Sequence, residues 1–155
     1  MQSKYMITVA PGTRMTRKRK NIVAAADFFA REILDLANIK CVIAIEFVHG
    51  MLKERNIFAE CNYIKKGKIA HISIDANIHK HLAYNTIAHE MVHAKQWIKG
   101  ELSLNRSGSK LLWNGIAPAK GTAYHHTDWE IEAMRKEILM QHEFCLHTER
   151  IKNVN

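Results

Sequence analysis

Hydrophobic residues recur at helical spacing in three parts of the chain. Residues 21–39 predict an amphipathic helix capped by Asn21, because apolar side chains return every three or four positions. Residues 82–98 predict a second helix, with apolar residues around most of its circumference. A third helix is predicted from Asp128 to about Ile151.

The segments between the first two helices have the composition of strands. Residues 41–48 (CVIAIEFV) are rich in β-branched side chains and end before a His-Gly pair. Residues 56–64 and 68–75 flank Lys-Lys-Gly at 65–67, which predicts a β-hairpin.

The region after the second helix is less regular. Residues 100–109 predict a loop, and Asn114-Gly115 between apolar stretches predicts a small hairpin within residues 110–120. Strands clustered between helices indicate an α+β fold in one domain spanning residues 1–155, with a small, mostly antiparallel sheet of about three strands.

Composition favours a globular protein of the cytoplasm. Of the 155 residues 47% are hydrophobic, which argues against disorder, and no apolar run is long enough to span a membrane. The first residues do not have the pattern of a signal peptide. The cysteines, Cys41, Cys61 and Cys145, are odd in number and far apart, so we expect reduced thiols and neither zinc ligands nor a nucleophile.

The net charge of +8 is concentrated in part in RMTRKRK, residues 14–20. We interpret this run as a basic, solvated N-terminal arm before the first helix. Such a run can follow a phosphate backbone, which allows weak contact with nucleic acid. No aromatic residue in it could stack on bases, which favours the solvated arm. Nothing in its composition can bind zinc or take up a proton at neutral pH, so we expect the arm to be dispensable for catalysis.

The second predicted helix contains His-Glu-x-x-His, as His89, Glu90 and His93. Positions i and i+4 share a helix face, so both imidazoles can aim at one metal ion. Catalytic zinc takes three protein ligands and leaves one position for water, and a neighbouring carboxylate such as Glu90 can take a proton from that water. On a buried helix these polar residues would be costly without a metal, which favours a metal site. The alternative is that they form a polar stripe on the surface.

A third ligand must come from downstream. The candidates are His125, His126, Glu130, Glu132, His142 and His147. Glu130 and Glu132 are two residues apart on a helix and diverge, so only one of them can face the metal. Each has another possible role: Glu130 in a capping box with Thr127, and Glu132 in an ion pair with Arg135 or Lys136.

Three segments, HEMVHAKQW (89–97), LLWNG (111–115) and DWEIEA (128–133), resemble small gluzincin-type (minigluzincin-like) zinc metallopeptidases, similar to predicted metallopeptidases of phage and bacterial genomes. The resemblance covers the C-terminal half. It implies a zincin-like fold, one Zn²⁺ per chain, and Glu130 as the third ligand, opening a Glu-x-x-Ala pattern. Met134 stands where many relatives carry Asp or Asn, so the usual contact from that position to a zinc histidine should be lacking.

The function implied is a zinc-dependent peptidase acting on a peptide or protein substrate, with Glu90 as general base, in the host cytoplasm if the gene belongs to a phage. Residues 68–75 are expected to form an exposed cleft edge that pairs with an extended peptide. Tyr124, His125 or His126 could donate a hydrogen bond to the developing oxyanion. Trp97, Trp113 and Trp129 are expected in the core or the cleft wall.

Two alternatives remain at this level. One is a DNA-associated protease of the SprT-like group, which the basic arm supports, although the later histidine of that group, in an H-G-x-x-F-like context, is absent. The other is a non-enzymatic nucleic-acid-binding or virion-associated protein with a structural or vestigial zinc site. Glu90 argues against the latter, because a structural site needs no general base.

Overall fold

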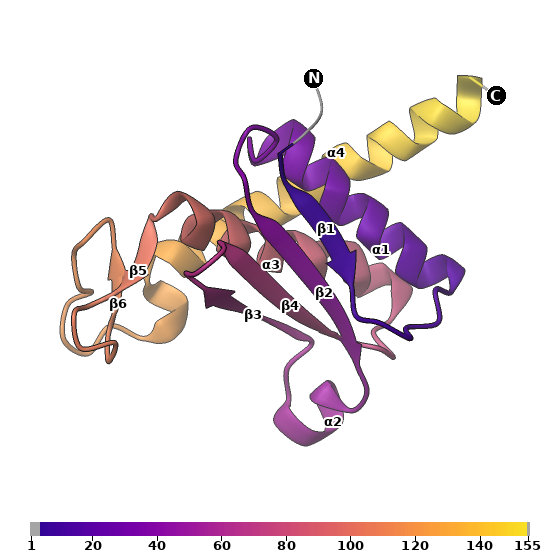
Figure 1. Ribbon diagram of the computed structural model, residues 1–155. Coiled ribbons are helices and arrows are strands. Elements are labelled where there is room, and N and C mark those ends of the chain that lie inside the picture. Colours follow the sequence, from indigo (N-terminus) through magenta and orange to yellow (C-terminus); the bar gives the residue numbers. More distant parts are fainter. Residues whose placement is uncertain (1–3, 155) are drawn as a thin grey trace.

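A four-stranded mixed sheet with helices over one face forms the molecule, whose computed structural model describes residues 4–154 (Figure 1). The strands follow the order β1-β2-β4-β3. Their bounds are Met6–Val9 for β1, Val42–Val48 for β2, Ala59–Ile64 for β3 and Ile69–Asp75 for β4. β1 and β4 pair with β2 in parallel, whereas β3 pairs with β4 antiparallel.

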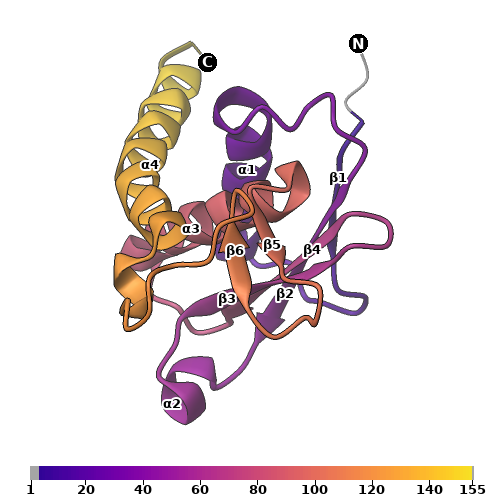
Figure 2. The ribbon, with the colours of Figure 1, turned by 90° about the vertical axis from the view of Figure 1, so that its left-hand side faces the viewer.

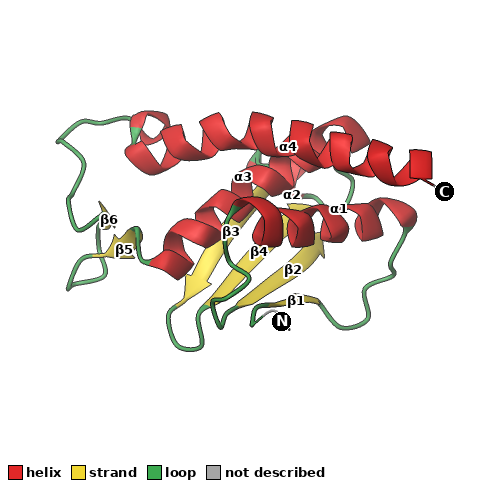
Figure 3. Cartoon of the chain, turned by 90° about the horizontal axis from the view of Figure 1, so that it is seen from above, coloured by secondary structure: helices red, strands yellow, loops and turns green. Residues whose placement is uncertain are grey.

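The helices form two further layers, so that α1 and α3 lie on the sheet and α4 lies on the far side of them (Figures 2 and 3). The main helices are α1 (Arg17–Phe28), which continues as a π-helical turn (Phe29–Ile33), α3 (Lys80–Lys99) and α4 (Asp128–Val154). The shorter elements are helix α2 (Met51–Arg55), the hairpin of β5 (Leu102–Leu104) and β6 (Leu111–Trp113), and a 3-10 turn (Tyr124–His126). No helix in the described range 4–154 has the length and apolar character needed to cross a membrane.

Apolar and polar side chains alternate along the central strands, and the apolar ones form the core. The side chains facing the helices are fully or almost fully buried, and in β2 and β4 they include Ile43, Ile45, Ile72 and Ile74. The opposite face carries polar residues, such as the pair of His71 and Glu46 at 3.2 Å. This is the period-2 pattern of a sheet covered on one side.

The sheet differs from the predicted one in strand number and direction. The α+β class and the hairpin around residues 65–67 are confirmed. The fourth strand, β1, has four residues and its pairing to β2 is non-local, so no turn signal marks it. Two of the three pairings are parallel, and the expectation of a mostly antiparallel sheet was wrong.

The prediction that residues 68–75 form an exposed edge was also wrong. β4 is hydrogen-bonded on both sides, to β2 and to β3, and β3 is the outer strand beside α3. The hairpin uses one side of β4, and the apolar strand β2 occupies the other. The free edge near the motif helix therefore belongs to residues 59–64.

The basic run at residues 14–20 is not a loose arm. α1 begins at Arg17, and the hydroxyl of Thr16 accepts from the Arg19 amide at 3.3 Å, so Thr16 is the N-cap in place of Asn21. Lys18 donates to the carbonyls of Ala76 and Ile78 at 3.1 and 3.0 Å. The second half of the run is therefore the docked first turn of a helix.

The segment after α3 contains more structure than expected. Residues 100–109 include β5, which pairs with β6. The turn at Asn114-Gly115 is confirmed, because Trp113 and Ile116 exchange two hydrogen bonds of 2.9 Å and both turn residues have positive φ.

Candidate metal centre

The motif helix α3 is buried on most of its surface. Its apolar residues pack against the sheet on one side and α4 on the other. The side chains of the motif share this burial: Glu90 and His93 are each only 7% exposed. The alternative of a polar stripe on the surface is therefore excluded.

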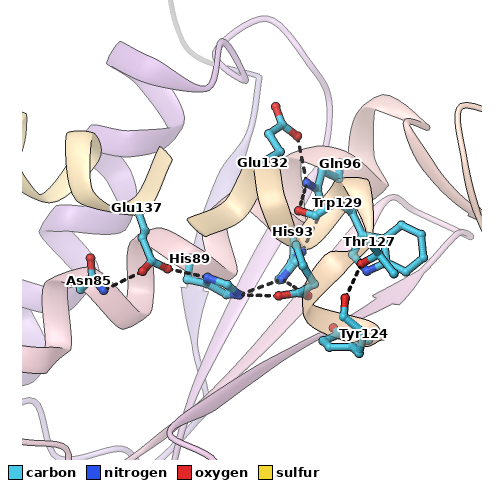
Figure 4. Close-up of polar contacts among 10 residues, drawn as sticks. Asn85, His89, His93, Gln96, Tyr124, Thr127, Trp129, Glu132 and Glu137 are labelled. Atoms are coloured by element: carbon cyan, nitrogen blue, oxygen red, sulfur yellow. Dashed lines mark hydrogen bonds and ion pairs between the residues drawn. The ribbon is translucent and has the colours of Figure 1, made fainter. Parts of the chain in front are cut away.

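His89, His93 and Glu130 converge on one point, as Figure 4 shows for the two labelled histidines. The Nε2 atoms of His89 and His93 are 3.0 Å apart. Glu130, in the first turn of α4, places one oxygen 3.4 Å from Nε2 of His89 and the other 3.0 Å from Nε2 of His93. The structure thus brings together the three residues predicted as ligands, and this group could hold a metal ion.

The donor set can bind a cation because the Nδ1 atoms of both histidines have hydrogen-bond partners outside the cluster, which leaves the Nε2 atoms for the ion. Nδ1 of His89 contacts Glu137 at 2.5 Å, and Nδ1 of His93 contacts the side-chain oxygen of Gln96 at 2.9 Å. Both partners accept hydrogen bonds, so both Nδ1 atoms carry hydrogen and each ring turns Nε2 inward. With a metal ion in place of the proton, two Nε2 lone pairs and a carboxylate would face that ion.

The spacing of these atoms also suits a metal. Bonds of about 2.0–2.1 Å at tetrahedral angles place neighbouring ligand atoms roughly 3.3 Å apart. At this site Nε2 of His93 lies 3.0 Å from Nε2 of His89 and 3.0 Å from one oxygen of Glu130, while His89 lies 3.4 Å from the other oxygen. The three residues are therefore close enough together to hold one ion.

Without a metal, the cluster would retain a proton. Burial alone would lower the pKa of His89, but hydrogen bonds to Glu130 and Glu137 outweigh it and raise that pKa to about 10. Burial would raise the pKa of Glu130, but hydrogen bonds from His89, His93 and Tyr124 hold it far below its usual value. The metal-free site is thus an imidazolium facing a carboxylate.

Glu137 holds His89 and was not found by sequence reasoning. It lies two turns beyond Glu130 on α4, on the same helix face, and Asn85 donates to its other oxygen at 3.0 Å. Met134, the position expected to supply such a contact in relatives, is 40% exposed. A carboxylate seven residues after Glu130 was the available signal, because that spacing returns to the same face.

Gln96 holds His93 and connects the two ligand helices. Its side chain is fully buried, and its amide donates to the carbonyl of Trp129 and to Glu132, both at 2.9 Å. Glu132 also binds Lys95 and Lys136, each at 2.7 Å. Glu132 is therefore not in the cluster, and the predicted ion pair with Lys136 is present.

The other candidate ligands lie elsewhere. His125 and His126 form the exposed 3-10 turn, His142 is exposed, and His147 packs on the ring of Phe28. The capping box is not formed, because the Thr127 hydroxyl donates to the carbonyl of Tyr124 and Glu130 faces the histidines.

A cleft of about 470 Å³ opens onto the cluster. Glu90 lines it beside the histidines, and burial raises the pKa of this carboxyl. Cys61 lies in the wall opposite, on β3, and burial together with Glu90 raises the pKa of its thiol well above the usual value. A thiol in that state is a poor nucleophile, and all three cysteines are free, as predicted.

Aromatic residues complete the cleft. Trp97 and Trp129 line its wall, as expected, and Trp113 lies on β6 near Trp129. Tyr124 also lines it, and burial with a hydrogen bond to Glu130 raises the pKa of its hydroxyl. Among the three proposed oxyanion donors, only Tyr124 reaches the cleft.

Comparisons of the chain with protein-family models, with curated proteins and with solved structures find no match, so the residues and their geometry carry the functional argument.

Proposed function

We propose that this protein is a zinc-dependent peptidase. The observation that carries the proposal is the placement of Glu90, a buried carboxyl group in the same cleft as a three-residue cluster that could hold a metal ion. Bound zinc would make a water molecule acidic and polarise a substrate carbonyl. His89, His93 and Glu130 would hold it and leave the cleft side open.

Glu90 has the environment of a general base. It lies in the cleft beside the three clustered residues, where it can take a proton from a water molecule bound to the metal. It can then pass that proton to the amine that leaves when the peptide bond breaks. A structural metal site would need no such group, and this favours the enzyme over the metal-stabilised binder.

Tyr124 and β3 are suited to handle the substrate. The Tyr124 hydroxyl lies at the mouth of the site and can turn from Glu130 to the oxygen of a reacting carbonyl. The free edge of β3 runs along the cleft, where an extended peptide can add as a further strand.

Glu90→Gln tests the proposal. The amide keeps the shape of the side chain but cannot accept the proton, so zinc content should stay near one per chain. The rate on an unstructured protein such as casein should fall by about 10² to 10⁴. Glu149→Gln, at an exposed position on α4, is the matched control and should leave the rate unchanged.

Two results would contradict the proposal. Equal rates for wild type and Glu90→Gln would remove Glu90 from the mechanism. Zinc bound at one per chain with no hydrolysis by the wild type would favour a structural or vestigial site.

A further inference from the structure

A second groove lies beside the metal cleft. It has a volume of about 830 Å³ and lies between the β3–β4 turn and the β5–β6 hairpin, a region at the left of Figure 1. Trp97 and Leu102 line both hollows, so the two lie side by side. We call this second hollow the basic groove.

The charge of the basic groove is one-sided. Its lining includes four cations, Lys65, Lys68, Lys99 and Arg106, and no carboxylate. Lys99 has a distant partner, the exposed Asp35 at 3.7 Å. Glu101, the acidic residue nearest in sequence, is already bound to the buried Lys95 at 2.6 Å. The potential in the groove is therefore uncompensated and positive.

The other end of the metal cleft is neutral by contrast. Its one cation, Arg55, forms a two-pronged pair with Glu60 at 2.6 and 2.7 Å. A peptide lying along β3 thus meets a neutral surface on one side of the metal site and a cationic one on the other.

From these observations we propose that the basic groove selects substrates with acidic side chains on one side of the scissile bond, an inference that rests on the proposed peptidase function. Along α3, Trp97 lies about 6 Å beyond His93, and Gly100 lies about 10 Å beyond His93. At about 3.3 Å per residue, the acidic side chains belong two to four residues from the cleaved bond.

Stacking geometry favours a peptide over a nucleic acid as the occupant. Tyr63 and Trp97 stack on each other, with centroids 5.5 Å apart and planes 14° apart, so each ring has at most one face left for a base. Single-stranded nucleic acid needs free aromatic faces for its bases. An acidic peptide needs only the cations and the strand edge.

The test uses two unstructured peptides that differ only in carrying Glu or Gln at the second to fourth residues on each side of the cleavage site. The wild type should cleave the Glu peptide with kcat/KM about tenfold higher, as a few partly exposed ion pairs allow, and salt should reduce that ratio. The product masses show on which side the acidic residues act.

Variants connect the preference to the groove. The triple change Lys65→Gln, Lys68→Gln and Arg106→Gln should bring the Glu/Gln ratio to about one. The control changes three exposed lysines outside both hollows, Lys20→Gln, Lys53→Gln and Lys120→Gln, and should keep the ratio. Equal cleavage of both peptides by the wild type would overturn the inference and leave the peptidase proposal intact.

Binding gives a readout that does not need turnover. Fluorescence anisotropy with zinc-loaded Glu90→Gln should show tighter binding of the Glu peptide than of the Gln peptide. That preference would support the groove even if no peptide were cleaved. An oligo-dT probe that bound more tightly than the Glu peptide, and lost affinity in the triple groove variant, would overturn the inference and assign the groove to nucleic acid.

Discussion

His89 should remain protonated through neutral pH when the metal is removed. Burial alone would lower the pKa of its imidazole, but the carboxylates of Glu130 and Glu137 raise it to about 10. The difference from the ordinary value of 6.5, at about 1.36 kcal/mol per pH unit, corresponds to roughly 5 kcal/mol of preference for the charged ring. Two carboxylates in contact with one buried ring account for an effect of this order.

NMR titration of the histidine rings in chelator-treated protein measures this pKa directly. The resonance that is missing in His89→Gln belongs to the His89 ring. In Glu137→Gln, the amide oxygen can still accept from Nδ1 but the charge is gone, so the midpoint of His89 should fall by roughly 1–2 pH units. A wild-type midpoint near 6.5 would refute the reasoning.

The sign of the pH dependence follows from the direction of this pKa. A histidine with a raised pKa stabilises the fold fully below 6.5, and this contribution is lost as pH rises toward 10, so the metal-free protein should melt at lower temperature in alkali. Zinc competes with the same proton, so its apparent affinity should rise by up to about tenfold per pH unit. The same pH dependence of the melting temperature in the metal-free and the zinc-loaded protein would contradict this linkage.

Other perturbations test the remaining contacts. His93→Ala should abolish zinc retention, measured by elemental analysis, and lower the melting temperature of protein purified with zinc. Burial would raise the pKa of Glu132, but Lys136, Lys95 and Gln96 lower it to about 2. Protonation in acid therefore removes a stabilising contribution between about pH 4.5 and pH 2. Glu132→Gln should make the loss of stability over this range smaller, as measured by urea unfolding. Charge reversal at Arg17 and Lys20 should leave the cleavage of a small neutral peptide unchanged and weaken only salt-sensitive binding of acidic partners. Slower peptide cleavage in that variant would give the basic run a role in the site.

Helical periodicity was sufficient to predict the histidine pair, and the resemblance was needed to predict Glu130. The i, i+4 spacing of His89 and His93 fixes their common face, and the resemblance in DWEIEA selected Glu130, which the structure places with them. His89 and His93 lie on α3, and Glu130 lies in the first turn of α4. Local geometry therefore decides the histidine pair before tertiary packing is known, whereas the contact of Glu130 with it requires α4 to pack on α3.

One supporting residue and the sheet depended on contacts between distant segments. Glu137 acquires its role only when α4 docks on α3. Gln96 contacts His93 three residues away on the same helix, but nothing marked it among the other polar helix residues. β1 is short and finds its partner β2 more than thirty residues away, and the hairpin signal revealed only the antiparallel half of the sheet. Strand order is set by such non-local pairing, which periodicity does not encode.

The two histidines and the third ligand are joined by a long excursion of the chain, residues 94–129, that leaves the site as the β5–β6 hairpin and returns through an exposed 3-10 turn. The contacts of Lys95 and Gln96 with α4 fix the two helices right beside the ligands. The exposed tips of the excursion, residues 107–110 and 114–123, lie outside the cleft lining, so their length is independent of the three clustered side chains. Insertions or deletions at its exposed tips should be tolerated without moving a ligand atom. A sequence signature for chains of this architecture should accordingly leave the interval between HExxH and the glutamate open, and require instead the glutamate pair spaced by seven on the following helix.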